Sequence, residues 1–216
     1  MAKTWNDFVS LVAVDVAGCP PLAIREALKE AFATFCEQSG FWAEDLEPIS
    51  LSAEIADYDL SPPVGARVVT LLSATYRGTP IAAYSGADVE QDMRGWLTSV
   101  GGTPVAYQLF LDDAAQMIRL YPTPAADEDE ALVVRASLKP TADATSLPDW
   151  FYEDWRMVLA SGALSNLCAV PSKTWSNAEL AVYHGKLFRQ GITKAMARLA
   201  TGGTNKVLTA RPVRFG

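Results

Sequence analysis

The only histidine of the chain, His184, limits the chemistry that the sequence can support. A Ser-His-Asp triad would have to use it, but no G-x-S-x-G motif holds a nucleophilic serine on a sharp turn. A second histidine, a C-x-x-C pair and an H-E-x-x-H motif for zinc are also absent. We therefore interpret His184 as an ordinary helix residue and predict a protein that is not an enzyme, with no catalytic residues, no metal site and no cofactor.

Four other short motifs are more typical of turns and loops than of binding sites. The glycine pairs at 101–102 and 202–203 lack the flanking residues of nucleotide-binding loops, so we predict a turn and a helix end. The acidic pair at 112–113 could bind a cation, but adjacent acids at a hairpin tip usually form the turn itself. The run of four acids at 127–130 is predicted to be a solvent-exposed loop.

The overall charge is acidic, with 18 Lys and Arg residues against 25 Asp and Glu residues and a formal net charge of −7. Proteins that hold DNA by its phosphates need clustered basic residues, so the composition argues against a DNA-binding protein. An acidic surface would suit the wall of a channel through which DNA slides, since it repels phosphate. It would equally serve solubility, and the sequence leaves both interpretations open.

The cysteines and the N-terminus indicate a cytosolic chain at synthesis. Cys19, Cys36 and Cys168 are odd in number and widely spaced, so we predict buried free thiols in a reducing compartment. The N-terminal residues contain no long apolar segment of a secretory signal. No apolar run approaches the roughly 20 residues that a membrane-spanning helix needs, so no membrane association is predicted.

Apolar residues repeat with helical spacing near both ends of the chain, which predicts helical segments there. Residues 5–14 form a short, weak pattern, and a clearer helix begins at Pro20 and Pro21 and ends at Gly40. Two later helices, near 146–170 and 176–201, each begin with a capping box of the form S-x-x-[DE], with Ser146 and Ser176 as the caps. The apolar stripe of the last helix is Leu180, Tyr183, Leu187, Ile192, Ala195 and Leu199.

Between these helices the period changes to two, which is typical of half-buried strands. The predicted strands are 49–55, 66–76, 105–111, 117–121 and 132–138. Residues 77–80 form a predicted turn, the third and fourth strands a predicted antiparallel hairpin, and residues 88–97 one short helix. The connections are too short for βαβ crossovers, so the sheet should be mainly antiparallel.

The order of elements predicts an α+β fold in which helices from both ends of the chain form one bundle. Each helix must bury its apolar stripe, and packing the two ends together achieves this most simply. The middle of the chain is then an inserted, sandwich-like β domain. The predicted division is 1–47 and 146–203 for the helical bundle, 48–145 for the β domain and 204–216 for an extended tail.

Six tryptophans mark the ends of predicted elements. They are Trp5, Trp42, Trp96, Trp150, Trp155 and Trp175. An indole ring at such a position can pack into the core or a corner while its N–H stays near water. Aromatic residues are also enriched at protein interfaces, so some could contact a partner.

The tail at 204–216 is basic in an otherwise acidic chain and contains no acid. Lys206, Arg211, Arg214 and Phe215 are its candidate partner-binding residues. A free terminus is often simply disordered. The functional interpretation is a segment that becomes ordered on a partner, by adding a strand or by anchoring its aromatic ring.

A series of short motifs runs in order along nearly the whole chain. They are segments 24–28 and 35–39 followed by Trp42, the strand end 58–60, the hairpin end Ile118-Arg119-Leu120-Tyr121-Pro122-Thr123-Pro124, the pairs 139–140 and 147–148, the helix segment Ala160-Ser161-Gly162-Ala163-Leu164, and segments 175–177, 181–183 and 188–192. In their order and spacing they resemble the head-to-tail adaptor proteins of tailed bacteriophages, of which tail tubular protein A of short-tailed phages is one kind.

This resemblance implies a structural virion protein without catalytic residues. It implies a ring, typically of twelve copies, between the portal protein and the tail nozzle or another tail protein, with genomic DNA passing through its channel. The tail at 204–216 would engage the portal. The protein would be part of the virion neck, after assembly in the host cytoplasm. Two alternatives stay open, namely another neck or tail-completion subunit, and a ligand- or carbohydrate-binding β-sandwich protein.

Overall fold

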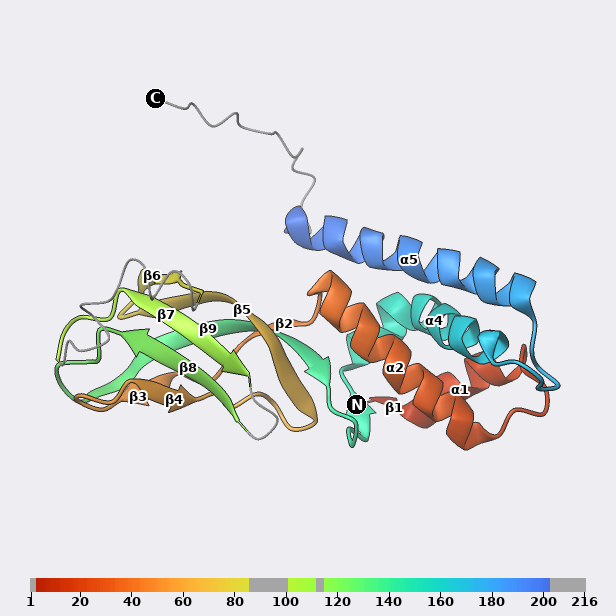
Figure 1. Cartoon of the computed structure of the whole chain (residues 1–216), viewed down its shortest axis with the longest axis horizontal. Coiled ribbons are helices and arrows are strands. Elements are labelled where there is room, and N and C mark those ends of the chain that lie inside the picture. The colour runs from red at the N-terminus through yellow and green to blue at the C-terminus, as the bar shows by residue number, and fades with distance from the viewer. Residues whose placement is uncertain (1–2, 86–100, 112–114, 203–216) are drawn as a thin grey trace, which may run out of the picture. The chain divides into compact units, whose positions relative to one another are not determined.

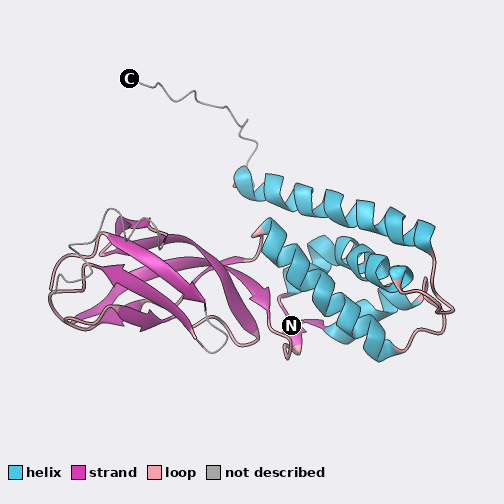
Figure 2. Ribbon diagram, in the orientation of Figure 1, coloured by secondary structure: helices cyan, strands magenta, loops and turns pink. Residues whose placement is uncertain are grey.

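The chain divides into two compact units, each with its own core. The computed structural model describes residues 3–85, 101–111 and 115–202. One unit contains both ends of the chain, residues 1–41 and 145–216, and is mainly helical; the other, residues 42–144, is mainly β-sheet (Figure 1 and Figure 2). The predicted α+β class is confirmed. The predicted helix at 88–97 and the acidic pair at 112–113 lie outside the described residues.

Helices from both ends of the sequence pack together in the helical unit. Its elements are β1 (Lys3–Thr4), α1 (Trp5–Ala13), α2 (Pro21–Ser39), β10 (Ser146–Leu147), the π-helical turn η1 (Phe151–Trp155), α4 (Arg156–Ala169) and α5 (Ala178–Ala200). Helix α4 contacts α1, α2 and α5. Strands β1 and β10 pair antiparallel, with Thr4 opposite Ser146. Ser146 is therefore a strand residue, and the prediction that it caps the following helix is wrong.

Helix α2 begins and ends where the sequence predicts. A proline in the first turn lacks only an N–H that has no partner in the helix, so Pro21 is tolerated there. Gly40 ends the helix in the left-handed conformation, with φ of 61°, and its N–H donates to the Cys36 carbonyl at 2.9 Å. This conformation carries little penalty for glycine because it has no Cβ.

Aromatic side chains fill the core of the helical unit. Phe8, Phe32, Phe35 and Phe151 are fully buried. The Phe32 ring meets those of Phe8 and Phe151 nearly edge to face, with centroids 5.1 and 5.2 Å apart. Such geometry directs the positive edge of one ring toward the negative face of another. The described tryptophans are all buried or half-buried, which agrees with core and corner packing.

Glycine allows α4 to lie very close to its neighbours. A Cβ on Gly162 would lie 2.8 Å from both Ala31 Cβ of α2 and Phe188 Cε2 of α5. A Cβ on Gly191 of α5 would overlap the Val158 side chain of α4. The backbone of α4 therefore approaches α2 and α5 more closely than any larger residue would permit.

The strands of the other unit form one curled, mainly antiparallel sheet, as predicted. They are β2 (Ala43–Asp45), β3 (Ile49–Leu51), β4 (Asp57–Asp59), β5 (Ala66–Tyr76), β6 (Thr79–Ala83), β7 (Ala106–Leu111), β8 (Gln116–Tyr121) and β9 (Glu128–Pro140). Their order is β2-β9-β5-β6-β7-β8-β4, with β3 also paired to β9. Every pair is antiparallel except β6 with β7.

The sequence pattern located β5, β7 and β8 correctly, together with the second half of β9, but it does not predict β2, β4 or β6. The prediction that the acids at 127–130 form a loop is wrong from Glu128 onward, because β9 begins there and pairs with β3. The predicted hairpin is β7 with β8. The predicted turn at 77–80 joins β5 to β6, but only Arg77 and Gly78 form it, because Thr79 and Pro80 already pair with β5. Alternate residues of β9, from Leu132 to Leu138, are fully buried. The prediction of a strand over 49–55 is wrong beyond Leu51, because Glu54 turns the chain with a φ of 63° and leaves Ile55 49% exposed.

Among the described helices, none combines the length and the apolar character that crossing a membrane requires.

Because α4 lies so close to α2 and α5, a methyl group added at the contact should destabilise the protein. In an open helix position Gly→Ala stabilises by about 1 kcal/mol, because alanine is the better helix former. Gly162→Ala and Gly191→Ala should instead lower the free energy of unfolding by about 1–3 kcal/mol, because the new methyl group overlaps a packed neighbour. Urea denaturation would measure this.

A matched control is Ala197→Leu, which adds volume on the exposed side of α5 with a residue that is nearly as good a helix former as alanine. It should change the free energy of unfolding by less than about 0.5 kcal/mol. If both glycine variants were as stable as the original protein, the close approach of these helices would be refuted.

Candidate functional site

Helix α5 has a well-defined start one residue later than the sequence predicts. The Asn177 side-chain oxygen accepts hydrogen bonds from the N–H groups of Glu179 and Leu180, both at 3.1 Å, so Asn177 is the N-cap. Ser176, the predicted cap, instead accepts from the Lys173 N–H at 2.8 Å and donates to the Val170 carbonyl. These contacts fix the turn that leads from α4 into α5.

Small residues decide which face of α5 is buried. Its buried residues are Ala181, Gly185, Gly191, Ile192 and Ala195. Ile192 and Ala195 belong to the stripe that the sequence predicts, but Tyr183 of that stripe is 57% exposed. The adjacent Val182 is 70% exposed. The contact face is rotated toward the glycines, so a tyrosine and a valine lie on the outer face of the helix.

The outer face of α5 is also basic. Lys186, Arg189 and Lys194 are exposed, and none of them forms an ion pair with the described residues. Only Arg198 has an acidic partner there, Asp154, at 2.8 Å. The sequence contains the signal for this face, because residues 180–216 hold seven Lys and Arg residues and no acid. Only the part of this feature that lies in the tail, at 204–216, is predicted from the sequence above.

The four candidate partner-binding residues of the tail, Lys206, Arg211, Arg214 and Phe215, lie outside the described residues. The described part of the chain ends just after α5, at Gly202. Their role therefore stays a prediction.

The surroundings of His184 differ from those of a catalytic histidine. Its Nδ1 is buried and has no hydrogen-bond partner among the described residues, so no carboxylate there orients the ring through that atom. Its ring contacts the Tyr183 ring, with centroids 5.2 Å apart. Within residues 3–85, 101–111 and 115–202, no group of three His, Cys, Asp or Glu side chains could hold a metal ion.

All three cysteines are free and buried, which agrees with the interpretation as structural thiols. Burial raises the pKa of Cys36, of Cys19 and of Cys168 above the ordinary value for a thiol. The thiolate is the reactive form, so these residues are poor nucleophiles at neutral pH.

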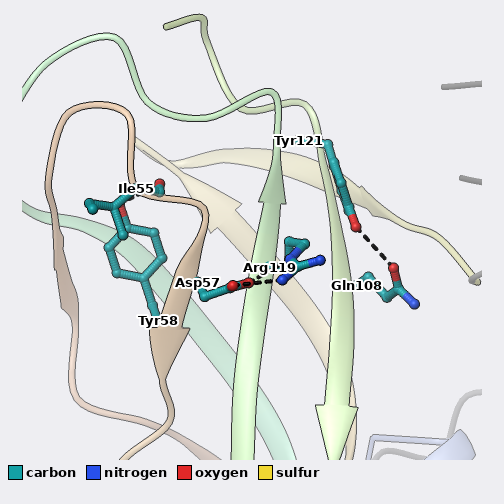
Figure 3. Close-up of polar contacts among 6 residues, drawn as sticks. All are labelled: Ile55, Asp57, Tyr58, Gln108, Arg119 and Tyr121. Carbon is teal, nitrogen blue, oxygen red and sulfur yellow. Dashed lines mark hydrogen bonds and ion pairs between the residues drawn. The ribbon is translucent and has the colours of Figure 1, made fainter. Parts of the chain in front are cut away.

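Polar side chains in the β unit hold its strands and turns together (Figure 3). The Arg119 guanidinium of β8 donates two hydrogen bonds, each 2.6 Å long, to the Asp57 carboxylate of β4. These hydrogen bonds lower the pKa of Asp57 below its usual value. The Tyr121 hydroxyl, also of β8, donates to the Gln108 side chain of the neighbouring strand β7 at 3.1 Å. These groups already have partners, so they act as structural contacts.

A tyrosine fixes the turn that follows β3. The Tyr58 hydroxyl lies 3.0 Å from the carbonyl oxygens of both Ser52 and Ile55, and it accepts a hydrogen bond from the Ser52 N–H at 3.1 Å. Figure 3 shows its ring directed toward Ile55. Burial is the main cause of the raised pKa of Tyr58. The turn is therefore held rigidly although its outer residues are exposed.

A cavity of about 260 Å³ lies beside the turn between β5 and β6. Tyr76, Arg77 and Ile81 line it, and the Arg77 guanidinium is already paired with Glu128 at 2.7 Å. Pockets for small ligands are usually larger, about 300–1,000 Å³, and hold several convergent polar groups. The cavity gives little support to the alternative of a ligand-binding protein.

Within the part of the chain that the structure describes, these features are those of a structural protein. A β-sheet unit is inserted into a helical unit, and the polar contacts described above serve the fold. The family described as SU10 adaptor protein matches residues 4–213, so the chain belongs to this family. No curated protein matches the chain.

Membership confirms the resemblance to phage head-to-tail adaptors that the sequence motifs suggested. The family consists of structural phage adaptors and not of enzymes. It implies association with portal and tail proteins in an oligomer and a location in the virion neck.

The pair of Asp57 with Arg119 predicts a pH-dependent contribution to stability. Because the folded state lowers the pKa of Asp57, the pair stabilises the protein above the ordinary aspartate pKa of 3.8, and this contribution is lost as the pH falls through the folded pKa. Asp57→Asn should therefore lower the free energy of unfolding at pH 7 by about 0.5–1 kcal/mol, given the partial exposure of the pair. The deficit should shrink below pH 3.8.

Denaturant titrations at several pH values would measure the deficit. Asp45→Asn is the control, since Asp45 pairs with Arg135 more loosely, at 3.1 Å, and is 62% exposed. An Asp57→Asn deficit that is the same at acidic and neutral pH would contradict the assignment.

Proposed function

We propose that this chain is one subunit of a ring that connects the portal of a tailed bacteriophage to its tail and leaves a central channel for DNA. The observation that carries the proposal is the family match over residues 4–213. Twelve copies per ring is the number proposed, by analogy with the adaptors that the chain resembles. The subunits would assemble in the host cytoplasm and remain in the virion neck.

We further propose that the helices of both chain ends form a bundle and that a sandwich-like β domain is inserted between them in the sequence. The proposed parts are 1–47 and 146–203 for the bundle, 48–145 for the β domain and 204–216 for the tail. The two compact units support this division, because the boundaries between them lie near residues 41 and 145. An insertion of this kind would give one subunit two separate surfaces for neighbours.

The charge of the chain supports passage of DNA without sequence-specific binding. The β unit, residues 42–144, contains sixteen acidic and six basic residues, a net charge of −10. A channel wall with this charge repels the phosphate backbone and so does not retain the genome during ejection.

The basic tail is proposed to bind the portal through Lys206, Arg211, Arg214 and Phe215. Its three bases would pair with acidic groups, and the phenylalanine ring would enter an apolar pocket. A segment that becomes ordered only on binding can cover a large surface of its partner.

The ring itself can be tested with purified protein and the cognate portal. Native mass spectrometry and electron microscopy should find a closed ring of this chain on the portal. A stable monomer with no affinity for the portal would refute the proposal, and saturable binding of a carbohydrate by that monomer would favour the ligand-binding alternative.

If the tail binds the portal, its removal should weaken docking to the portal and leave folding unaffected. Removal of residues 204–216 should leave the melting temperature unchanged within about 2 °C, because the tail lies beyond α5. The truncated chain should bind the portal at least about tenfold more weakly, as measured by biolayer interferometry. In the full-length chain, Phe215→Ala measures how much the aromatic ring contributes to portal affinity. The combined Lys206→Ala, Arg211→Ala and Arg214→Ala change measures how much the three bases contribute. Unchanged portal affinity of the truncated chain would exclude this role.

A further inference from the structure

The outer face of α5 has the composition of a protein-binding surface. Val182 and Tyr183 are exposed near the start of the helix, and Lys186, Arg189 and Lys194 follow on the exposed side. Tyrosine and arginine are enriched among residues that dominate binding energy at interfaces. The three bases have no acidic partner among the described residues, so a negatively charged surface would complement this face.

The charge of the chain is divided so that two copies complement each other. Residues 180–216 carry seven bases and no acid, whereas the β unit has a net charge of −10. The basic end of one copy would therefore be attracted to the β unit of another. An interface between two different surfaces of identical subunits is heterologous, and its repetition closes a ring when the rotation between subunits permits.

One part of the β unit combines exposed acids with an exposed apolar side chain. Asp127, Asp129 and Glu130 are exposed at and before the start of β9, and Glu54 is exposed in the adjacent turn. Ile55 in that turn is 49% exposed. We call these five residues the acidic corner. Its mixture of negative charge and one apolar group mirrors the mixture on α5.

Internal hydrogen bonds hold the acidic corner in place. The Asp127 carboxylate accepts a hydrogen bond from the Ala53 N–H at 2.7 Å, and the Glu54 N–H donates to the Pro124 carbonyl at 2.9 Å. The Glu130 N–H donates to the Ser50 hydroxyl at 3.1 Å. Together with the Tyr58 contacts, they order the corner before any partner arrives, which reduces the entropy lost on binding.

We propose that the outer face of α5 in one subunit binds the acidic corner of the β unit in the neighbouring subunit. This inference rests on the proposed ring and names the surfaces that form it. Val182 and Tyr183 contact the apolar side chain of Ile55, and the bases Lys186 and Arg189 pair with the acids around it. Because part of the attraction is electrostatic, ring formation weakens as salt is added.

Charge reversal tests the proposal in the full-length chain. The combined Lys186→Glu and Arg189→Glu change should reduce ring formation on the portal by about tenfold or more, because like charges then face each other. Native mass spectrometry and electron microscopy measure the rings, and thermal melting verifies the fold. The matched control combines Arg156→Glu and Lys173→Glu, which alter the net charge equally at exposed positions outside α5 and should leave ring formation unchanged.

A rescue variant identifies the partner surface. Asp129→Lys and Glu130→Lys, added to the Lys186→Glu and Arg189→Glu chain, restore opposite charges across every interface of the ring and should restore assembly. Asp127 stays unchanged because its carboxylate holds the turn through Ala53.

Each remaining outcome counts against the proposal. Normal rings from the charge-reversed chain overturn it and leave the proposed function intact. Normal rings that no longer bind the portal assign the α5 face to the portal, and normal rings that lose only retention of DNA assign it to phosphate. Loss of assembly without rescue refutes the acidic corner as the partner. A wild-type chain that forms no ring overturns the proposed function together with this inference.

Discussion

The close packing of α4 against its neighbours is the constraint on which the rest of the helical unit depends. Gly162 has Ala31 of α2 on one side and Phe188 of α5 on the other, and no larger residue fits between them. The separation of two helices and the face that each presents to the other are set together by the side chains at their contact. Here glycine permits the contact, so α5 lies on α4 with its small residues inward. That rotation is the reason why a tyrosine, a valine and several bases face outward.

The β unit depends on a different constraint, which is the fixed position of its exposed turns. The unit uses polar side chains for this purpose, through the bidentate pair of Arg119 with Asp57 and the contacts of Tyr58 around the turn after β3. A surface that must fit a neighbour benefits from such order, because less conformational freedom is lost on contact. The hydrogen bonds that could suggest a catalytic site therefore serve the fold.

Membership of the SU10 adaptor protein family is consistent with a chain whose described polar side chains stabilise the fold. An adaptor needs several surfaces and no pocket, and the described polar groups are accordingly tied to the fold. Charge is divided unevenly along the sequence, because the β unit, residues 42–144, has a net charge of −10 and residues 180–216 carry seven bases and no acid.

The sequence by itself determined the fold class, the helices at both ends, the strands β5, β7 and β8 with the second half of β9, and the lack of residues for a catalytic constellation built on His184. These features depend on periodicity, on glycine and proline, and on residue types that chemistry requires, all of which are local. It also determined that bases gather near the C-terminus, although their distribution between helix and tail was misjudged.

Only the tertiary structure decided which face of α5 is buried, where the chain leaves the strand after Leu51, and which acids come together with Ile55. Each depends on contacts between residues far apart in the sequence. Asp127 reaches Ala53 across more than seventy positions, and the contact that orients α5 comes from α4. A hydrophobic stripe predicts that a helix will be buried on one side, but the residues on both sides of the contact decide its rotation, and here they include Gly162 of α4 and Gly185 and Gly191 of α5.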